Sequence, residues 1–204
     1  MAAATAAACD WWAVATKRKG VEYVAKPSVV ALAAVAAATV HPIAPLRRDL
    51  FVVALLLSLL GDVFLMLPRD RFLAGLASFL AAQLTYAAAF AIVGAPARTT
   101  VVVALVYVAV AGLPAGAILK AVAASGRGLL HVAPVVAYLA GISAMAVLAM
   151  ATGNATAVAG AALFTVSDTV LGWNRFVREL PFAKLAIIVT YHLAQLLLVA
   201  SLVT

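Results

Sequence analysis

The chain has 204 residues, of which 67% are hydrophobic and 10% are charged, and its mean hydropathy is +1.17. This composition excludes an ordinary soluble domain, because the apolar residues form stretches of about 18–20 residues that can cross a bilayer as helices. The formal net charge of +7 does not indicate nucleic-acid binding, since no basic run alternates with aromatic residues. The single cysteine, Cys9, excludes an internal disulfide, and three scattered histidines predict no metal site.

Apolar stretches between charged or Pro/Gly-rich connections predict eight transmembrane helices. In chain order they cover residues 2–15, 27–44, 50–67, 73–93, 99–119, 129–150, 155–172 and 183–203. The first contains Asp10 and only about a dozen apolar positions, so a partial or interfacial helix is the alternative there. The short connections predict an all-α membrane protein with a single polytopic domain over residues 1–204.

The distribution of lysine and arginine predicts the orientation of these helices. The odd-numbered connections hold eleven of these residues: Lys17, Arg18, Lys19, Lys26, Arg69, Arg71, Lys120, Arg127, Arg175, Arg178 and Lys184. The even-numbered connections hold three, Arg47, Arg48 and Arg98. The positive-inside rule therefore places the odd connections in the cytoplasm and both termini outside, whether or not the first helix crosses. Because no organelle-targeting segment is evident, we expect the inner membrane of a bacterium.

The two halves of the chain contain similar phrases. Asp62 precedes Thr85 by 23 residues, and Asp168 precedes Thr190 by 22. An Arg-Phe pair follows each aspartate and a tyrosine follows each threonine. These matches predict two parallel four-helix repeats, about residues 1–95 and 99–204, related by an axis along the membrane normal.

Asp62 and Asp168 are the most informative residues, because each lies inside an apolar stretch. A carboxylate in a membrane helix costs about 2.5–3.5 kcal/mol on insertion scales, and it usually faces a cavity or a partner. Each lies about 7–9 Å from the cytoplasmic end of its helix at 1.5 Å per residue. Polar side chains expected at similar depth are Gln83, Tyr86, Tyr191 and Gln195, with Lys26 and Arg175 at the membrane boundary. Together they predict a pocket with carboxylates, amides and hydroxyls inside and cations at its mouth.

Each of these residues also has a simpler interpretation. A membrane aspartate can serve only to hydrogen-bond a neighbouring helix, and a glutamine can do the same for about 0.6 kcal/mol. The tyrosines can be packed aromatics, and Lys26 and Arg175 can be topology determinants or snorkelling anchors. The residues alone leave these alternatives open.

The phrases and their spacing resemble the lysoplasmalogenase (YhhN-like) family of membrane proteins. The resemblance is carried by residues 26–27, 61–66, 71–76, 86 with 90, 160–171, 175–176 and 190–195, and it runs from about residue 23 to 199. The chain departs from the family pattern at Gln83, where many relatives have histidine.

The resemblance implies a hydrolase that cleaves the vinyl ether bond of a lysoplasmalogen to a fatty aldehyde and a glycerophospho-base. Asp62 and Asp168 would be catalytic, one as the acid and the other as the carboxylate that stabilises the cation or activates water. Residues implied to bind the substrate are Lys26, Gln83, Tyr86, Arg175, Tyr191 and Gln195. The lysophospholipid would come from the bilayer into a site open to the cytoplasm, and no metal or organic cofactor is implied. Two neighbouring buried carboxylates resist ionising together, so one is expected to be protonated.

Two other functions fit parts of the pattern. Membrane carboxylates and a repeat are also typical of proton-coupled secondary transporters, although here both aspartates are expected near one face rather than at the midplane. The third hypothesis is a lipid-binding or scaffold protein without catalysis.

Overall fold

The computed structural model describes residues 1–41, 44–67, 71–126 and 128–204, and this part of the chain forms eight α-helices with no strand. The helices are α1 (Ala2–Ala15), α2 (Lys19–Thr39), α3 (Pro45–Met66), α4 (Phe72–Val93), α5 (Ala97–Ala124), α6 (Leu129–Ala151), α7 (Ala155–Phe176) and α8 (Ala183–Ala200). Seven of them, α2 to α8, are long and apolar enough to cross a membrane. The predicted all-α membrane fold is confirmed.

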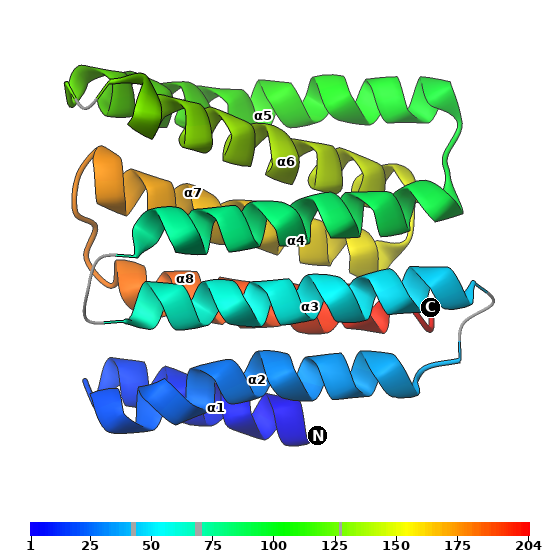
Figure 1. Ribbon diagram of the computed structural model, residues 1–204. Coiled ribbons are helices and arrows are strands. Elements are labelled where there is room, and N and C mark those ends of the chain that lie inside the picture. Colours follow the sequence, from blue (N-terminus) through cyan, green and yellow to red (C-terminus); the bar gives the residue numbers. More distant parts are fainter. Residues whose placement is uncertain (42–43, 68–70, 127) are drawn as a thin grey trace.

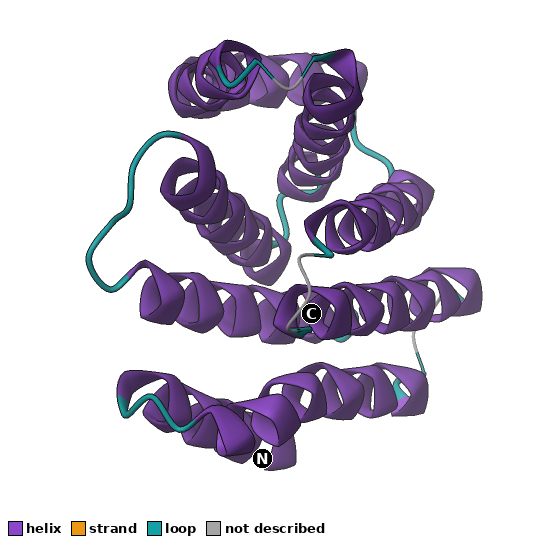
Figure 2. Ribbon diagram, turned by 60° about the vertical axis from the view of Figure 1, so that its left-hand side comes forward, coloured by secondary structure: helices purple, strands orange, loops and turns teal. Residues whose placement is uncertain are grey.

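The helices lie side by side, and the chain turns back at the end of each one (Figure 1). One edge of the bundle is formed by α1 and α2 and the opposite edge by α5 and α6, while α3, α4, α7 and α8 lie between them. The N-terminus lies at the edge of the bundle in both views (Figure 1, Figure 2). The pairs that pack most extensively are α3 with α4, α7 with α8, and α4 with α6.

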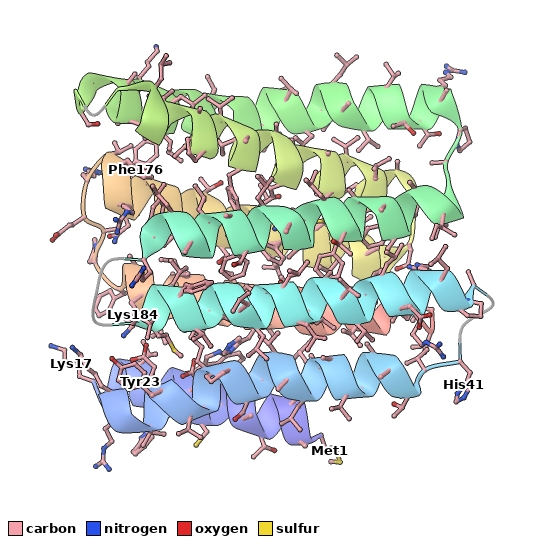
Figure 3. All side chains as sticks on the ribbon, in the orientation of Figure 1. Met1, Lys17, Tyr23, His41, Phe176 and Lys184 are labelled. Atoms are coloured by element: carbon pink, nitrogen blue, oxygen red, sulfur yellow. The ribbon has the colours of Figure 1, made fainter. Side chains whose placement is uncertain are left out.

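The helix ends that the odd-numbered connections join lie at one end of the bundle, on the left of Figure 1, and the helix ends that the even-numbered connections join lie at the other. Lys17 and Lys184 mark the first end in Figure 3, and His41 marks the second. The odd-numbered connections are predicted to share one end because successive helices alternate in direction, and the helix ends they join do so. Arg69 and Arg127, which contributed to the charge count, lie outside the described residues.

Helix boundaries differ from the predicted ones mainly at prolines. α2 begins at Lys19 rather than at residue 27 because Pro27 is accommodated inside the helix, which membrane helices tolerate. Lys26 therefore lies within a helix and not at its start. α3 begins at Pro45 rather than at residue 50, since a proline in the first turn has the backbone angle that a helix needs. The predicted helix over 99–119 already contains Pro114, and α5 extends beyond it to Ala124.

The first helix is the partial one that the sequence offered as an alternative. α1 has 14 residues, which is about 21 Å of helix and less than the hydrocarbon core of about 30 Å. It packs against α2 and α8, and it buries Asp10. Met1 lies short of the end marked by His41 (Figure 3). The orientation argument is unaffected, because the other seven helices keep their alternation.

Small residues allow α7 and α8 to approach closely. Gly160 on α7 is buried against Leu198 on α8. A Cβ atom at residue 160 would lie 3.0 Å from the backbone nitrogen of Leu198. Backbone atoms cannot move aside as a side chain can, so glycine at this position sets the distance between the two helices.

Gly160→Ala is expected to destabilise the protein by about 1–3 kcal/mol, because the added methyl group pushes α7 away from α8. The thermal unfolding temperature in detergent measures the effect. Gly116→Ala is the matched control, since a Cβ there meets nothing within 4 Å and alanine favours a helix over glycine by about 1 kcal/mol. An equal unfolding temperature for the two variants would contradict this packing.

Candidate functional site

The two membrane aspartates border the same cavity. It has a volume of about 290 Å³ and is formed by α1, α2, α3, α4, α7 and α8. Its polar lining consists of Lys19, Glu22, Tyr23, Lys26, Asp62, Ser167, Asp168, Lys184 and Tyr191. Tyr23 and Lys184 lie at the end of the bundle with the odd connections (Figure 3), so the cavity opens toward that end. The structure thus brings together residues that are more than a hundred positions apart in sequence.

Asp62 on α3 has a partner for each carboxylate oxygen. The ammonium group of Lys26 on α2 lies 2.9 Å from Oδ1, and the side chain of Asp62 is only 2% exposed. The hydroxyl of Tyr191 on α8 donates a hydrogen bond of 2.8 Å to Oδ2. A buried carboxylate with a cation and a hydroxyl donor is well suited to remain charged.

A chain of hydrogen bonds extends from Tyr191 away from the cavity. The amide nitrogen of Gln195 lies 3.3 Å from the Tyr191 hydroxyl, to which it donates. Gln195 in turn accepts a hydrogen bond of 2.7 Å from the hydroxyl of Tyr86 on α4. Tyr86 and Gln195 are buried behind the cavity wall, so they position Tyr191 rather than face the cavity themselves.

Asp168 on α7 has different surroundings. It accepts a hydrogen bond of 2.5 Å from the hydroxyl of Tyr138 on α6. Within the described residues, no lysine, arginine or histidine lies within ion-pair distance of it. The two aspartates therefore share the cavity but differ in electrostatic environment: Asp62 has a cation and Asp168 a neutral donor.

Two charged residues at the mouth of the cavity pair with each other. Lys184, whose side chain is 63% exposed, lies 2.7 Å from the carboxylate of Glu22, which is 11% exposed. Lys19 is exposed at the same mouth. The mouth can therefore offer cationic groups to an anion that displaces Glu22.

The remaining predicted residues lie apart from the cavity lining. Arg175 is exposed at the end of α7, and its guanidinium carbon lies 4.0 Å from the ring centre of Phe72. Gln83 on α4 is fully buried and is not among the residues that line the cavity. Of the eight predicted residues, the cavity brings together Asp62, Asp168, Lys26 and Tyr191.

The sequence interpretation missed Tyr138, Glu22 and the burial of Asp10. Tyr138 lies nine residues from the start of α6 and Asp168 eight from the end of α7, so matching their depths could have paired them. From the sequence, Asp10 only weakens the first helix as a membrane span, whereas in the structure it is 0% exposed. Neither of its carboxylate oxygens has a hydrogen-bond partner among the described residues. No sequence signal pointed to its burial, because it depends on how α1 packs.

The sequence matches one family of known proteins. The YhhN family model matches residues 21–202. The chain belongs to the YhhN family. The resemblance identified from the sequence is thus confirmed.

Three relatives of this YhhN-family chain are Lysoplasmalogenase TMEM86B of Sus scrofa, the Homo sapiens protein of the same name, and Lysoplasmalogenase TMEM86A of Homo sapiens. The two TMEM86B proteins are 37% and 36% identical over 153 residues, which is 72% of this chain and 61% of each relative. TMEM86A is 30% identical over 157 residues, 74% of this chain and 64% of the relative. The chain therefore spans about three fifths of the length of these curated relatives. No solved structure matches it.

Proposed function

We propose that this protein is a lysoplasmalogenase, a membrane-embedded hydrolase that cleaves the vinyl ether bond of a lysoplasmalogen. The products would be a fatty aldehyde and a glycerophospho-base. The observation that carries the proposal is the cavity bordered by two membrane aspartates in unlike environments. The names of the relatives support it.

The reaction needs an acid and a carboxylate. Protonation of the alkene carbon distant from the ether oxygen leaves an oxocarbenium ion, as in glycoside hydrolysis. Water attacks this ion and loses a proton, which gives a hemiacetal. The hemiacetal then releases the aldehyde, and the glycerol oxygen leaves with a proton. The acid gives one proton to the alkene carbon and the carboxylate takes one from water. Two carboxyl groups are therefore sufficient for the cycle.

The environments of the two aspartates support a division of roles. Asp168 has no cationic partner among the described residues, so it is suited to carry the proton and act as the acid. Asp62, paired with Lys26, is suited to remain a carboxylate that stabilises the oxocarbenium ion and accepts a proton from water. Tyr191 holds Asp62 in place. Sequence alone leaves this assignment open.

The charged mouth fits the head of the substrate. Lys19 and Lys184 line it, and Lys26 lies further in next to Asp62. A substrate phosphate could displace Glu22 from Lys184, because an ammonium group binds phosphate as readily as carboxylate. Arg175 at the same end of the bundle would contribute to the positive field that attracts the headgroup.

The orientation and the repeats remain part of the proposal. We propose that the end with the odd connections faces the cytoplasm of a bacterium and that the lipid enters from that leaflet. The lysine and arginine distribution supports this orientation.

Two repeats, about residues 1–95 and 99–204, are supported by the pairing of α3 with α4 and of α7 with α8, since α3 and α7 each carry one aspartate.

The test is fatty-aldehyde release from lysoplasmenyl-ethanolamine by the purified protein in detergent. In heavy water the aldehyde should carry one deuterium at the carbon next to the carbonyl, because the acid delivers its proton there. The saturated alkyl ether analogue has no double bond to protonate, so it should stay intact. A transporter has no gradient in detergent and would release nothing. Failure of monodisperse protein to form aldehyde would overturn the proposal.

A further inference from the structure

A second, smaller pocket also reaches Asp168. It has a volume of about 70 Å³ and lies between α5, α6 and α7. Asp168 is common to the lining of this pocket and of the main cavity. We call the pocket the α5 groove, and its α5 wall is formed by Tyr107, Val108, Ala111, Gly112, Ala115 and Ile118. Asp168 thus borders both the cavity with the charged mouth and a second opening.

The α5 groove is suited to hydrocarbon. Its α5 wall includes the small residues Ala111, Gly112 and Ala115, which leave space beside the helix. Three of the four hydroxyls in its lining have partners: Ser143 donates to the carbonyl of Leu139 at 2.6 Å, and the hydroxyls of Thr165 and Tyr107 lie 3.4 Å apart. A polar headgroup would gain little there, whereas an apolar chain leaves these bonds intact.

The groove opens toward the bilayer. α5 is the least buried of the seven long helices, and Val108 at the edge of the groove is 64% exposed. Asp168 lies about 12 Å from the end of α7, while Gly112 lies about 18 Å from the same end of the bundle along α5. The groove therefore leads from the aspartate toward the middle of the membrane, the direction in which a lipid tail points.

We infer that the α5 groove binds the first methylenes of the alkenyl chain, with the rest of the chain lying along α5 in the bilayer. This inference rests on the proposed function. The scissile bond of a lysoplasmalogen joins a charged head to an apolar chain, so a site for it needs a polar side and an apolar side that meet at the acid. Asp168 borders one of each.

Gly112→Phe tests the inference because the new ring would fill the groove. A Cβ at this position would lie 3.7 Å from the nearest side-chain atom, an ordinary contact, so the backbone accommodates it. The matched control is Leu113→Phe, one residue on, where the side chain is 81% exposed to the bilayer. Ala115→Leu is a milder second variant for the same groove, should the phenylalanine impair folding.

The readout is kcat/KM for two vinyl ether substrates, one with a long chain and one prop-1-enyl substrate whose chain ends one carbon beyond the double bond. Gly112→Phe should lower the long-chain value by about tenfold or more, since burial of several methylenes is lost. The prop-1-enyl value should change less than about twofold, as should both values for Leu113→Phe.

An equal loss for both substrates, no loss for either, or a matching loss in Leu113→Phe would overturn the inference. In each of these cases aldehyde release by the wild type would leave the proposed function standing. Absence of aldehyde from the wild type with both substrates would instead remove the proposed function, and the inference with it.

Discussion

Asp168→Asn is expected to lower aldehyde release by about 10²–10⁴-fold, the usual contribution of a general acid. Asparagine has nearly the same shape and its carbonyl oxygen can still accept the hydrogen bond from Tyr138. However, an amide cannot deliver a proton to the alkene carbon. The fold should therefore survive while the chemistry fails, and kcat/KM for lysoplasmenyl-ethanolamine measures the loss.

Tyr138→Phe is the control for this variant, because it removes the hydrogen bond and keeps the acid. Its loss of activity should be far smaller, about tenfold or less, as expected for a positioning residue worth one hydrogen bond. Thermal unfolding in detergent verifies that both variants fold. Full activity in folded Asp168→Asn protein would remove Asp168 from the mechanism, and equal losses in the two variants would argue against its role as the acid.

Lys26→Met is expected to destabilise the protein by about 3–5 kcal/mol, because it leaves a buried carboxylate without its cation. The side chain of Asp62 is only 2% exposed, and its ion pair with Lys26 measures 2.9 Å. Methionine retains the unbranched stem of the side chain, so lost packing contributes little. Denaturant unfolding in detergent measures the change.

The double variant Lys26→Met with Asp62→Asn separates the charge from the packing. Removal of both charges should restore most of the stability lost in Lys26→Met, since no uncompensated carboxylate remains. Both proteins should lack activity. A double variant as unstable as Lys26→Met would mean that the instability does not come from an unpaired carboxylate at Asp62.

Much of the architecture can be predicted from the sequence because the bilayer restricts what a chain can do. Every backbone polar group inside hydrocarbon must be paired within its own segment, so long apolar stretches become helices. Short connections then force successive helices to alternate in direction, which gathers the lysine-rich connections at one end. The same restriction makes Asp62 and Asp168 conspicuous, because a carboxylate is rare inside such a stretch.

Sequence is less informative at helix ends, since a proline can either begin a helix or lie inside one. Pro27 lies inside α2, whereas Pro45 begins α3. Local propensity does not distinguish the two cases, because packing against neighbouring helices decides whether the lost hydrogen bond is tolerated. Sequence likewise does not show whether α1 is a full or a partial membrane helix, because this depends on its packing against α2 and α8.

By itself the sequence determined the class of fold, the ends at which charges gather and the two aspartates. Only the tertiary structure decided their partners: Lys26 and Tyr191 for Asp62, and Tyr138 for Asp168. These contacts join residues 30 to 129 positions apart, so they depend on how each helix is rotated and which helix it packs against. Hydropathy fixes the depth of a side chain in the membrane, but it carries little information on rotation when a helix is apolar on every face. For that reason the groove beside Asp168 could be found only once α5, α6 and α7 were placed together.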